Sequence, residues 1–299
     1  MYKSASSLMK VFDCFTLFNE LDLLEFRLKY LDPVADYFVI AESNLTHSGQ
    51  PKPYYFQEAR ARFSRWEHKI IYLPVRQSTQ GLVFEPQTGY DPRSASWQLE
   101  NAQRNALLDA FPLMDKNDLV ILGDLDEIPS RAGIRKVRHL QKPLAFSMLF
   151  HYYFMNCQSI GECRWWKGSI AATAEQFKTI TPQGLRDKRD VYPSIPNAGW
   201  HFSYLGGIEK IRQKLVSFAH TEYHRPDYID PAAIETTVAK GGDILKREGY
   251  RFRYVPLSYY PRSLQQLMKE YPAHVRDAHD RPWAGVYYTL RRLVKNKSL

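Results

Sequence analysis

The first 125 residues alternate between short apolar runs and segments with helical spacing, and this alternation constrains the fold more than any other feature. Residues 11–18 and 37–41 are rich in β-branched and aromatic side chains, which predicts buried strands. Between them, residues 20–31 place leucines three or four positions apart, as on one helix face, and Asp32-Pro33 ends that helix. A strand, a helix and a second strand in this order predict parallel pairing with a helical crossover.

The same pattern repeats further along the chain. Helices are expected at residues 56–66 and 94–111, and strands at 69–75 and 118–123. Residues 76–93 form a polar segment that is long for a structureless connection, which suggests a functional loop. We therefore expect an α/β protein with a Rossmann-type, mostly parallel sheet flanked by helices.

After about residue 131 the pattern changes to longer, more polar strands mixed with helices. Strands are expected at residues 146–154, 164–173 and 251–257, and helices at 208–218, 232–240 and 264–271. No linker separates the two parts, so we expect one domain over residues 1–299. It comprises a nucleotide-binding-like half at about 11–130, a mixed acceptor-side half at about 131–280 and a basic C-terminal tail at 281–299.

The charge of the chain narrows the choice of partner. There are 41 Lys and Arg against 32 Asp and Glu residues, a net charge of +9 at neutral pH. This charge favours nucleic acid, peripheral contact with a membrane surface or a phosphorylated small molecule, and a solvated basic surface explains it equally well. No stretch approaches the ~18 consecutive apolar residues of a membrane span, and the N-terminus lacks the features of a secretory signal. With three cysteines and no CxxC pair, we expect a cytoplasmic protein without a zinc site or disulfide framework.

An acidic turn follows the apolar strand expected at residues 118–123. Asp124, Asp126 and Glu127 place three carboxylates within four residues, and these repel one another unless a cation or hydrogen-bond donors compensate. Ligands of open α/β sheets bind at the carboxyl ends of strands, and carboxylate oxygens suit Mn²⁺ or Mg²⁺. The turn therefore predicts a divalent metal site. The alternative is that Asp124 caps the turn while Asp126 and Glu127 begin a helix near Ser130.

Further short motifs occur in a fixed order between about residues 11 and 225. They are Asp13-x-Phe15-x-x-Phe18-Asn19-Glu20-Leu21-Asp22-Leu23-Leu24-Glu25-x-Arg27, Asp36-Tyr37-Phe38-Val39-Ile40-x-Glu42-Ser43, Gln103-Arg104-Asn105-Ala106, Gly123-Asp124-Leu125-Asp126-Glu127-Ile128-Pro129, Gly199-Trp200-His201-x-Ser203-Tyr204 and Lys214-Leu215-x-Ser217-Phe218-Ala219-His220. In combination they resemble the motifs of glycosyltransferase family 17.

The resemblance implies a GT-A-like fold, a UDP-sugar donor, a glycan or glycoconjugate acceptor, a divalent metal at the Asp-x-Asp and inversion at the anomeric carbon. It makes N-acetylglucosamine the default donor sugar. The family's vertebrate members carry a membrane anchor and a lumenal stem that this sequence does not show. We therefore do not expect a Golgi location or a role on N-glycans to transfer with it.

For the metal, the resemblance implies Asp126 as the direct ligand, with Asp124 reaching the ribose or a metal-bound water. Glu127 is expected beside them as a catalytic or supporting carboxylate. Two later histidines, His220 first and His201 second, are candidate ligands because imidazole binds Mn²⁺. For each histidine, a satisfied position in the core is the alternative.

The donor nucleotide is expected at the ends of the first two strands. The residues predicted near the uridine are Phe15, Asn19, Glu20, Glu42 and Ser43, and Phe15 has a core position as its alternative. Arg104 and Lys167 are candidate partners of the diphosphate, although Arg104 is also one helical turn from Glu100 and suited to an ion pair with it. Residues 76–93 are a candidate lid over the donor.

An inverting transfer needs a general base that takes the proton of the acceptor hydroxyl. Glu222 is our choice, and Glu209 and Asp187 remain alternatives in the same half. Aromatic side chains offer flat apolar faces to sugars, or simply form the core. The candidates for such stacking are Trp165, Trp166, Trp200, Tyr152 and Tyr153.

These observations favour a metal-dependent glycosyltransferase. The first alternative is a basic, aromatic-rich protein that binds nucleic acid or glycans without catalysis, but no nucleic-acid motif is present and acidic residues would repel phosphate without a metal. The second is a nucleotidyltransferase using the same turn, which would release pyrophosphate. The sequence contains no P-loop to support it.

Overall fold

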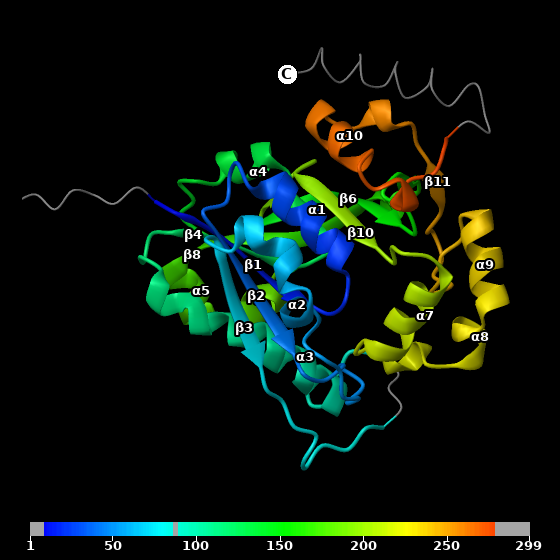
Figure 1. Ribbon diagram of the computed structural model, residues 1–299, viewed down its shortest axis with the longest axis horizontal. Coiled ribbons are helices and arrows are strands. Elements are labelled where there is room, and N and C mark those ends of the chain that lie inside the picture. Colours follow the sequence, from blue (N-terminus) through cyan, green and yellow to red (C-terminus); the bar gives the residue numbers. More distant parts are fainter. Residues whose placement is uncertain (1–8, 86–88, 279–299) are drawn as a thin grey trace, which may run out of the picture.

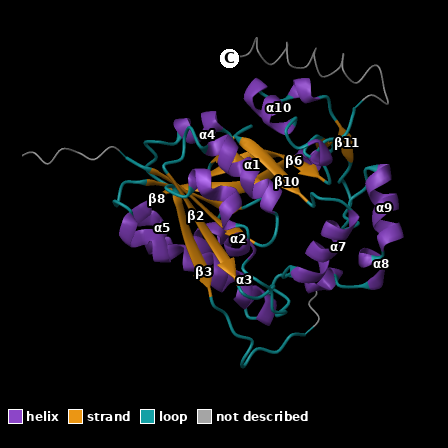
Figure 2. Ribbon diagram, viewed as in Figure 1, coloured by secondary structure: helices purple, strands orange, loops and turns teal. Residues whose placement is uncertain are grey.

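The computed structural model describes residues 9–85 and 89–278. The strands are β1 (Val11–Leu17), β2 (Tyr37–Ser43), β3 (Ile70–Val75), β4 (Leu119–Asp124), β5 (Glu127–Pro129), β6 (Leu144–Tyr152), β7 (Cys157–Ser159), β8 (Trp165–Thr173), β9 (Ser194–Ile195), β10 (Gly199–Ser203) and β11 (Phe252–Tyr254). The α-helices are α1 (Leu21–Leu31), α2 (Tyr55–Glu58), α3 (Ala95–Asn105), α4 (Arg131–Lys136), α5 (Ala174–Ile180), α6 (Pro182–Asp187), α7 (Ile208–Ser217), α8 (Pro226–Ile229), α9 (Pro231–Lys240) and α10 (Arg262–Met268). Figures 1 and 2 show these elements around a central sheet. The expected C-terminal tail at 281–299 lies outside the described residues.

The sheet has a parallel part and a mixed part. β3, β2, β1 and β4 lie side by side, and all three pairings between them are parallel. β8 then pairs antiparallel with both β4 and β6. β10 is parallel to β6 and antiparallel to β5. The parallel pairing predicted for the first half is confirmed, and the second half is mixed as expected.

The expectation of a mostly parallel sheet is wrong for the sheet as a whole. Residues 153–156 alone separate β6 from β7, and these two strands pair antiparallel. Two consecutive strands can pair in parallel only if a connection of about a dozen residues or more crosses between them. The connection between β6 and β7 is much shorter, and it therefore permits only antiparallel pairing.

Side chains of the parallel strands alternate between two cores. Val11, Phe15 and Leu17 of β1 enter one hydrophobic cluster, whereas Phe12 and Cys14 enter another on the opposite face. The first cluster is covered by α1 and α10, and the second by α5, α6 and the 3₁₀ segment Ala106–Leu113. This period of two explains why the strands are apolar throughout: both faces of the sheet are buried.

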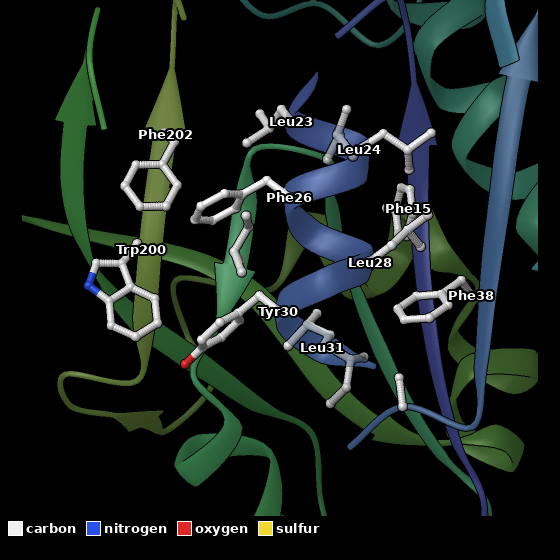
Figure 3. Close-up of a cluster of buried hydrophobic side chains, with 14 of the residues drawn as sticks. Phe15, Leu23, Leu24, Phe26, Leu28, Tyr30, Leu31, Phe38, Trp200 and Phe202 are labelled. Atoms are coloured by element: carbon white, nitrogen blue, oxygen red, sulfur yellow. The ribbon is translucent and has the colours of Figure 1, made fainter. Parts of the chain in front are cut away.

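Helix α1 joins the two parts of the sheet. Figure 3 shows Leu28 facing Phe15 of β1, while Phe26 and Tyr30 point to Phe202 and Trp200 of β10. The rings of Phe26 and Phe202 meet edge to face at 6.0 Å between centroids, and those of Tyr30 and Trp200 at 5.6 Å. β1 of the parallel part and β10, the strand that carries His201, therefore pack on one helix.

Two predicted helices are shorter than expected. The segment 56–66 is α2 followed by a 3₁₀ helix at Arg60–Trp66, and the segment 94–111 is α3 followed by the 3₁₀ helix at Ala106–Leu113. Pro112 lies inside the latter and lacks the N–H that an α-helix needs. Among the described residues, no helix has the length and apolar character needed to cross a membrane.

Candidate active site

A cavity of about 490 Å³ opens at the carboxyl ends of the parallel strands. The end of β1, the segment after β2 and the acidic turn after β4 all line it, and residues of α3, α6, α7, β6, β8 and β10 and of the segment before β11 form other parts of its wall. Its size falls within the ~300–1,000 Å³ of small-molecule sites. Parallel strands bring their carboxyl ends to one edge, which is why the acidic turn meets the ends of β1 and β2.

The acidic turn is held from beneath by one buried arginine. Arg27 of α1 is fully buried, and its Nη1 donates to the carbonyl oxygens of Asp124 at 2.8 Å, Leu125 at 3.0 Å and Glu127 at 2.8 Å. Its Nε and Nη2 donate to the two carboxylate oxygens of Asp13 on β1, at 2.8 and 2.7 Å. One guanidinium therefore satisfies three backbone acceptors and a buried charge, which sets the path of the turn.

Steric crowding explains why the residue before the acidic turn, Gly123, is a glycine. A Cβ at Gly123 would lie 2.3 Å from Ser169 Oγ of the neighbouring strand β8. That hydroxyl donates to the carbonyl oxygen of Glu127 at 3.0 Å. Only glycine lets β8 approach closely enough to make this bond.

Asp124 lies between two arginines. Arg104 Nη2 donates to its Oδ1 at 3.0 Å and Arg186 Nη2 to its Oδ2 at 2.7 Å. Burial alone would raise the pKa of Asp124, but the two guanidinium groups outweigh it and hold this pKa below the ordinary value. Arg104 also pairs with Glu100 at 2.8 Å, as its alternative role predicted, and it lines the cavity, so its contact with a diphosphate stays a prediction.

Glu127 lies behind the cavity wall. Its carboxylate is fully buried and accepts from Arg186 Nη1 at 2.8 and 2.9 Å and from Trp166 Nε1 at 2.7 Å. The backbone N–H of Asp124 donates to the same carboxylate at 3.1 Å. These contacts hold Arg186 and the turn in place, whereas Asp124 and Asp126 line the cavity.

Asp126 faces a lysine and a histidine. Lys214 Nζ of α7 donates to its Oδ2 at 2.9 Å, and His201 Nε2 of β10 lies 3.3 Å from its Oδ1. Burial opposes ionisation of Asp126, yet the Lys214 ammonium and His201 together hold its pKa well below the ordinary value. The pKa of Lys214 is in turn raised, because Asp126 and Glu20 outweigh its burial. The charged forms of both groups are thus favoured at neutral pH.

The two candidate histidines occupy different places. The ring of His201 packs against those of Phe150 and Trp166, at 5.0 and 4.7 Å between centroids, beside Asp126. His220 also lines the cavity, but its Nδ1 lies 2.9 Å from Glu222 Oε1. His201 is therefore the histidine that the fold places against the acidic turn.

Of the five residues predicted near the uridine, Glu20 lines the cavity. Phe15 is fully buried and packs under Arg27 at 4.4 Å from ring to guanidinium, so its core alternative holds. Asn19 Nδ2 donates to Gln213 Oε1 of α7 at 2.9 Å. The cavity wall at this end is formed instead by neighbours of these residues: Thr16, Leu17, Phe18, Leu45, Thr46 and His47.

Glu42 and Ser43 serve the packing of β2. Glu42 is fully buried and accepts from Tyr72 Oη at 3.0 Å and from the backbone N–H of Phe56 at 3.1 Å. Burial raises its pKa against the opposing effect of Lys52, whose ammonium lies 3.4 Å away. The Ser43 hydroxyl donates to Gln77. Neither residue lines the cavity.

The candidate bases also differ in position. Asp187 lines the cavity, and its Oδ1 accepts from Gln183 Nε2 at 2.8 Å. Glu222 reaches the cavity only through His220, and its Oε2 is buried with no partner among the described residues. Glu209 is exposed and pairs with Arg212 at 3.8 Å, away from the cavity.

The aromatic candidates divide between cavity and core. Tyr152 and Trp166 line the cavity. Trp200 is buried against α1, and Tyr153 is buried with its hydroxyl donating to the carbonyl oxygen of Gly242 at 2.7 Å. Trp165 is 40% exposed and lies off the cavity wall. Lys167, predicted at the diphosphate, does not line the cavity and donates to the carbonyl oxygen of Asp190, a residue of the cavity wall.

Sequence reasoning assigned no role to five cationic residues of the cavity: Lys52, Arg186, Arg189, Lys214 and Arg247. Arg189 lies 4.7 Å above the Trp166 ring, and Arg247 is bound by Asp243 at 2.8 Å. Lys214 belongs to one of the motifs that resemble the family, and this motif was the sequence signal that could have identified it as a site residue. No sequence pattern marks Arg186, which lies in the short helix α6, 59 positions after Glu127.

The described parts of the segment 76–93 reach the cavity through Tyr90. Its ring meets that of Trp97 edge to face at 4.7 Å, and its hydroxyl lies 3.4 Å from Asp187 Oδ1. Residues 86–88 of the candidate lid lie outside the described residues.

The fit of a divalent cation depends on Asp126 and His201. Within residues 9–85 and 89–278, no three His, Cys, Asp or Glu side chains gather as a metal-binding group. Asp126 Oδ1 and His201 Nε2, however, are 3.3 Å apart, close to the ~3.0 Å between neighbouring ligands with bonds of about 2.1 Å at right angles. The pair therefore fits a cation that takes its remaining ligands from phosphates and water.

Comparisons with known proteins bear on the family. The sequence model described as glycosyltransferase family 17 matches residues 1–281. The beta-1,4-mannosyl-glycoprotein 4-beta-N-acetylglucosaminyltransferases of Homo sapiens, Rattus norvegicus and Mus musculus are each 26% identical over 255 residues, covering 74% of this chain and 45% of the relative. The chain thus spans less than half the length of these relatives.

A solved apo structure of the bifunctional glycosyltransferase WbbM aligns with 97% of this chain and 53% of its own, at 9% identity and a TM-score of 0.31, too low to carry an argument. The family match covers all of the described residues, including the acidic turn, Arg27 and the helix that carries Lys214. The chain therefore belongs to glycosyltransferase family 17.

Proposed function

We propose that this protein is an inverting glycosyltransferase that moves N-acetylglucosamine from UDP-GlcNAc to a glycan hydroxyl, assisted by Mn²⁺ or Mg²⁺ at Asp126. The observation that carries the proposal is the single cavity in which Asp124 and Asp126 face the end of β1 and a set of fixed cations. Family membership and the names of the similar proteins support the transferred sugar. The arrangement agrees with a GT-A-like donor site.

The donor is proposed to extend from the end of β1 to the acidic turn. Thr16, Leu17 and Thr46 would contact the nucleoside, and Arg189 and Lys214 would lie near the diphosphate. Asp126 and His201 would hold the cation, which when bound would neutralise charge on the leaving diphosphate. Glu127 acts as a positioning residue, because it holds Arg186 and the backbone of the turn.

For the base, we propose that Glu222 acts through His220. With its Nδ1–H donated to Glu222 Oε1, the ring of His220 keeps Nε2 as the atom that can accept a proton in the cavity. The acceptor oxygen would form its bond to the anomeric carbon as the bond to the UDP oxygen breaks, and its proton would pass to His220. Tyr152 and Trp166 would offer their faces to the sugars.

The test combines binding and turnover. Thermal melts with UDP or UDP-GlcNAc, in Mn²⁺ and in EDTA, should show stabilisation by about 2.7 kcal/mol at a ligand concentration of 100 Kd. Transfer to glycan acceptors should release UDP, whereas a nucleotidyltransferase would release pyrophosphate. Asp126→Asn should remain folded but lose transfer activity. The control variant Asp109→Asn, at an exposed position, should keep transfer activity. Full transfer by Asp126→Asn, or no UDP stabilisation of the wild-type protein in any condition, would refute the proposal.

A further inference from the structure

The donor site contains a cation that belongs to the protein itself. Lys214 Nζ lies 2.9 Å from Asp126 Oδ2 and 3.6 Å from Glu20 Oε1, and all three residues line the cavity. Its side chain keeps 26% of its surface exposed and lines the cavity. It therefore stands between the acidic turn and the end of β1, where a diphosphate of the proposed donor would lie.

The helix that carries Lys214 is fixed on both sides of this residue. Gln213 accepts a hydrogen bond from Asn19 at 2.9 Å, and the carbonyl oxygens of Val216 and Ser217 accept from Ser48 Oγ and the His47 N–H, each at 3.0 Å. Leu215 is fully buried beneath them. Figure 1 shows α7 beside α8 and α9 at one side of the sheet. Lys214 is thus a positioned charge rather than a mobile surface side chain.

The position of this charge has opposite consequences for two ligands. An ammonium attracts the oxygens of a diphosphate, and a charge-assisted hydrogen bond to it strengthens binding. The same ammonium repels a divalent cation that approaches the carboxylate of Asp126, because it occupies the other oxygen of that carboxylate. A diphosphate neutralises both cations, so metal and nucleotide should bind in support of each other.

We propose that Lys214 is a diphosphate-binding residue of the donor site that also weakens the binding of a free divalent cation at Asp126. This inference rests on the proposed function, since it takes a nucleoside diphosphate as the ligand. In this proposal Lys214 binds the diphosphate in the absence of metal. The metal ion binds at Asp126 once the nucleotide is present.

The test uses Lys214→Met, which keeps the length of the side chain and removes its charge. UDP affinity in EDTA, measured by titration calorimetry, should fall ~10-fold or more, the value of one charge-assisted hydrogen bond. Mn²⁺ affinity without nucleotide, measured from the electron paramagnetic resonance signal of free Mn²⁺, should rise. Lys210→Met, an exposed lysine one turn earlier on α7, is the matched control and should change neither.

The outcomes separate this proposal from simpler explanations. If Lys214 had only a structural role, Lys214→Met would lower the affinities for both UDP and Mn²⁺. Lys214→Arg, which keeps the charge, should retain UDP binding in EDTA. If Lys214→Met fails to fold, loss of UDP binding in Lys214→Arg overturns the proposal. Wild-type protein that binds UDP only with Mn²⁺ overturns it too and leaves the proposed function intact. Wild-type protein that binds UDP in neither condition refutes the proposed function itself.

Discussion

Arg27 offers a direct test of how the acidic turn is built. The residue is fully buried, ion-paired with Asp13 and bonded to three carbonyl oxygens of the turn. Arg27→Met fills much of the same volume but leaves the carboxylate of Asp13 without its partner. It also leaves the carbonyl oxygens of Asp124, Leu125 and Glu127 without this donor. The site should lose its geometry together with its stability.

The size of the effect follows from burial. Removing one partner of a buried ion pair costs about 3–5 kcal/mol, because the remaining charge is left unpaired. The side chains of Arg27 and Asp13 are 0% and 1% exposed, so solvent screens little of this cost. For domains of 150–250 residues, 1 kcal/mol shifts Tm by about 2–4 °C, and the lower end of this range predicts a fall of about 6–10 °C here.

The assay is urea denaturation of the wild-type protein, Arg27→Met, Asp13→Leu and the double variant. The double variant removes both charges, so it should be no less stable than Arg27→Met alone. UDP binding by folded Arg27→Met should also weaken, because the turn has lost its support. If the two single costs add in the double variant, or if Arg27→Met costs less than about 1 kcal/mol, the pair does not hold the turn as described.

Two further predictions concern other residues. Burial lowers the pKa of His151 from 6.5 to about 3, so below pH 6.5 the unfolded chain binds a proton that the folded chain does not, and stability falls as the pH drops. Between pH 6.5 and 5 this residue should account for about 1.6 kcal/mol in urea denaturation, and an equal pH dependence in His151→Gln would contradict the assignment. For the base, His220→Asn should lower kcat by ~10²–10⁴-fold and Glu222→Gln by less, with UDP affinity unchanged. Undiminished turnover in His220→Asn would remove this residue from the mechanism.

Local patterns were sufficient for much of the first half of the chain. The strands at β1, β2, β3 and β4 were predicted within a few residues of their observed bounds. The apolar runs of β1, β2 and β4 are unambiguous because both faces of these strands are buried, in two separate clusters. The position of Asp124 and Asp126 at a cavity followed from the same pattern, since the carboxyl ends of parallel strands meet at one edge.

The orientation of individual side chains could not be predicted in the same way. Phe15, Glu42 and Ser43 lie at the predicted strand ends, yet the alternation of the strand and the demands of packing turn them away from the cavity. Thr16 and Leu17, one and two positions after Phe15, line it instead. A strand end specifies a place in the fold, whereas the side of the sheet that each residue faces depends on which neighbours cover it.

The sequence by itself determined the α/β class, the parallel strands and the acidic turn, because each depends on residues close together along the chain. Only the tertiary structure decided which charges meet at that turn. Arg27 arrives from α1, Arg186 from α6 and Lys214 from α7, the last 88 positions from Asp126. Nothing in the local pattern of a lysine or arginine distinguishes a solvated side chain from one that neutralises a buried carboxylate. That distinction appears only when separate helices pack around one end of the sheet and remove the water between them.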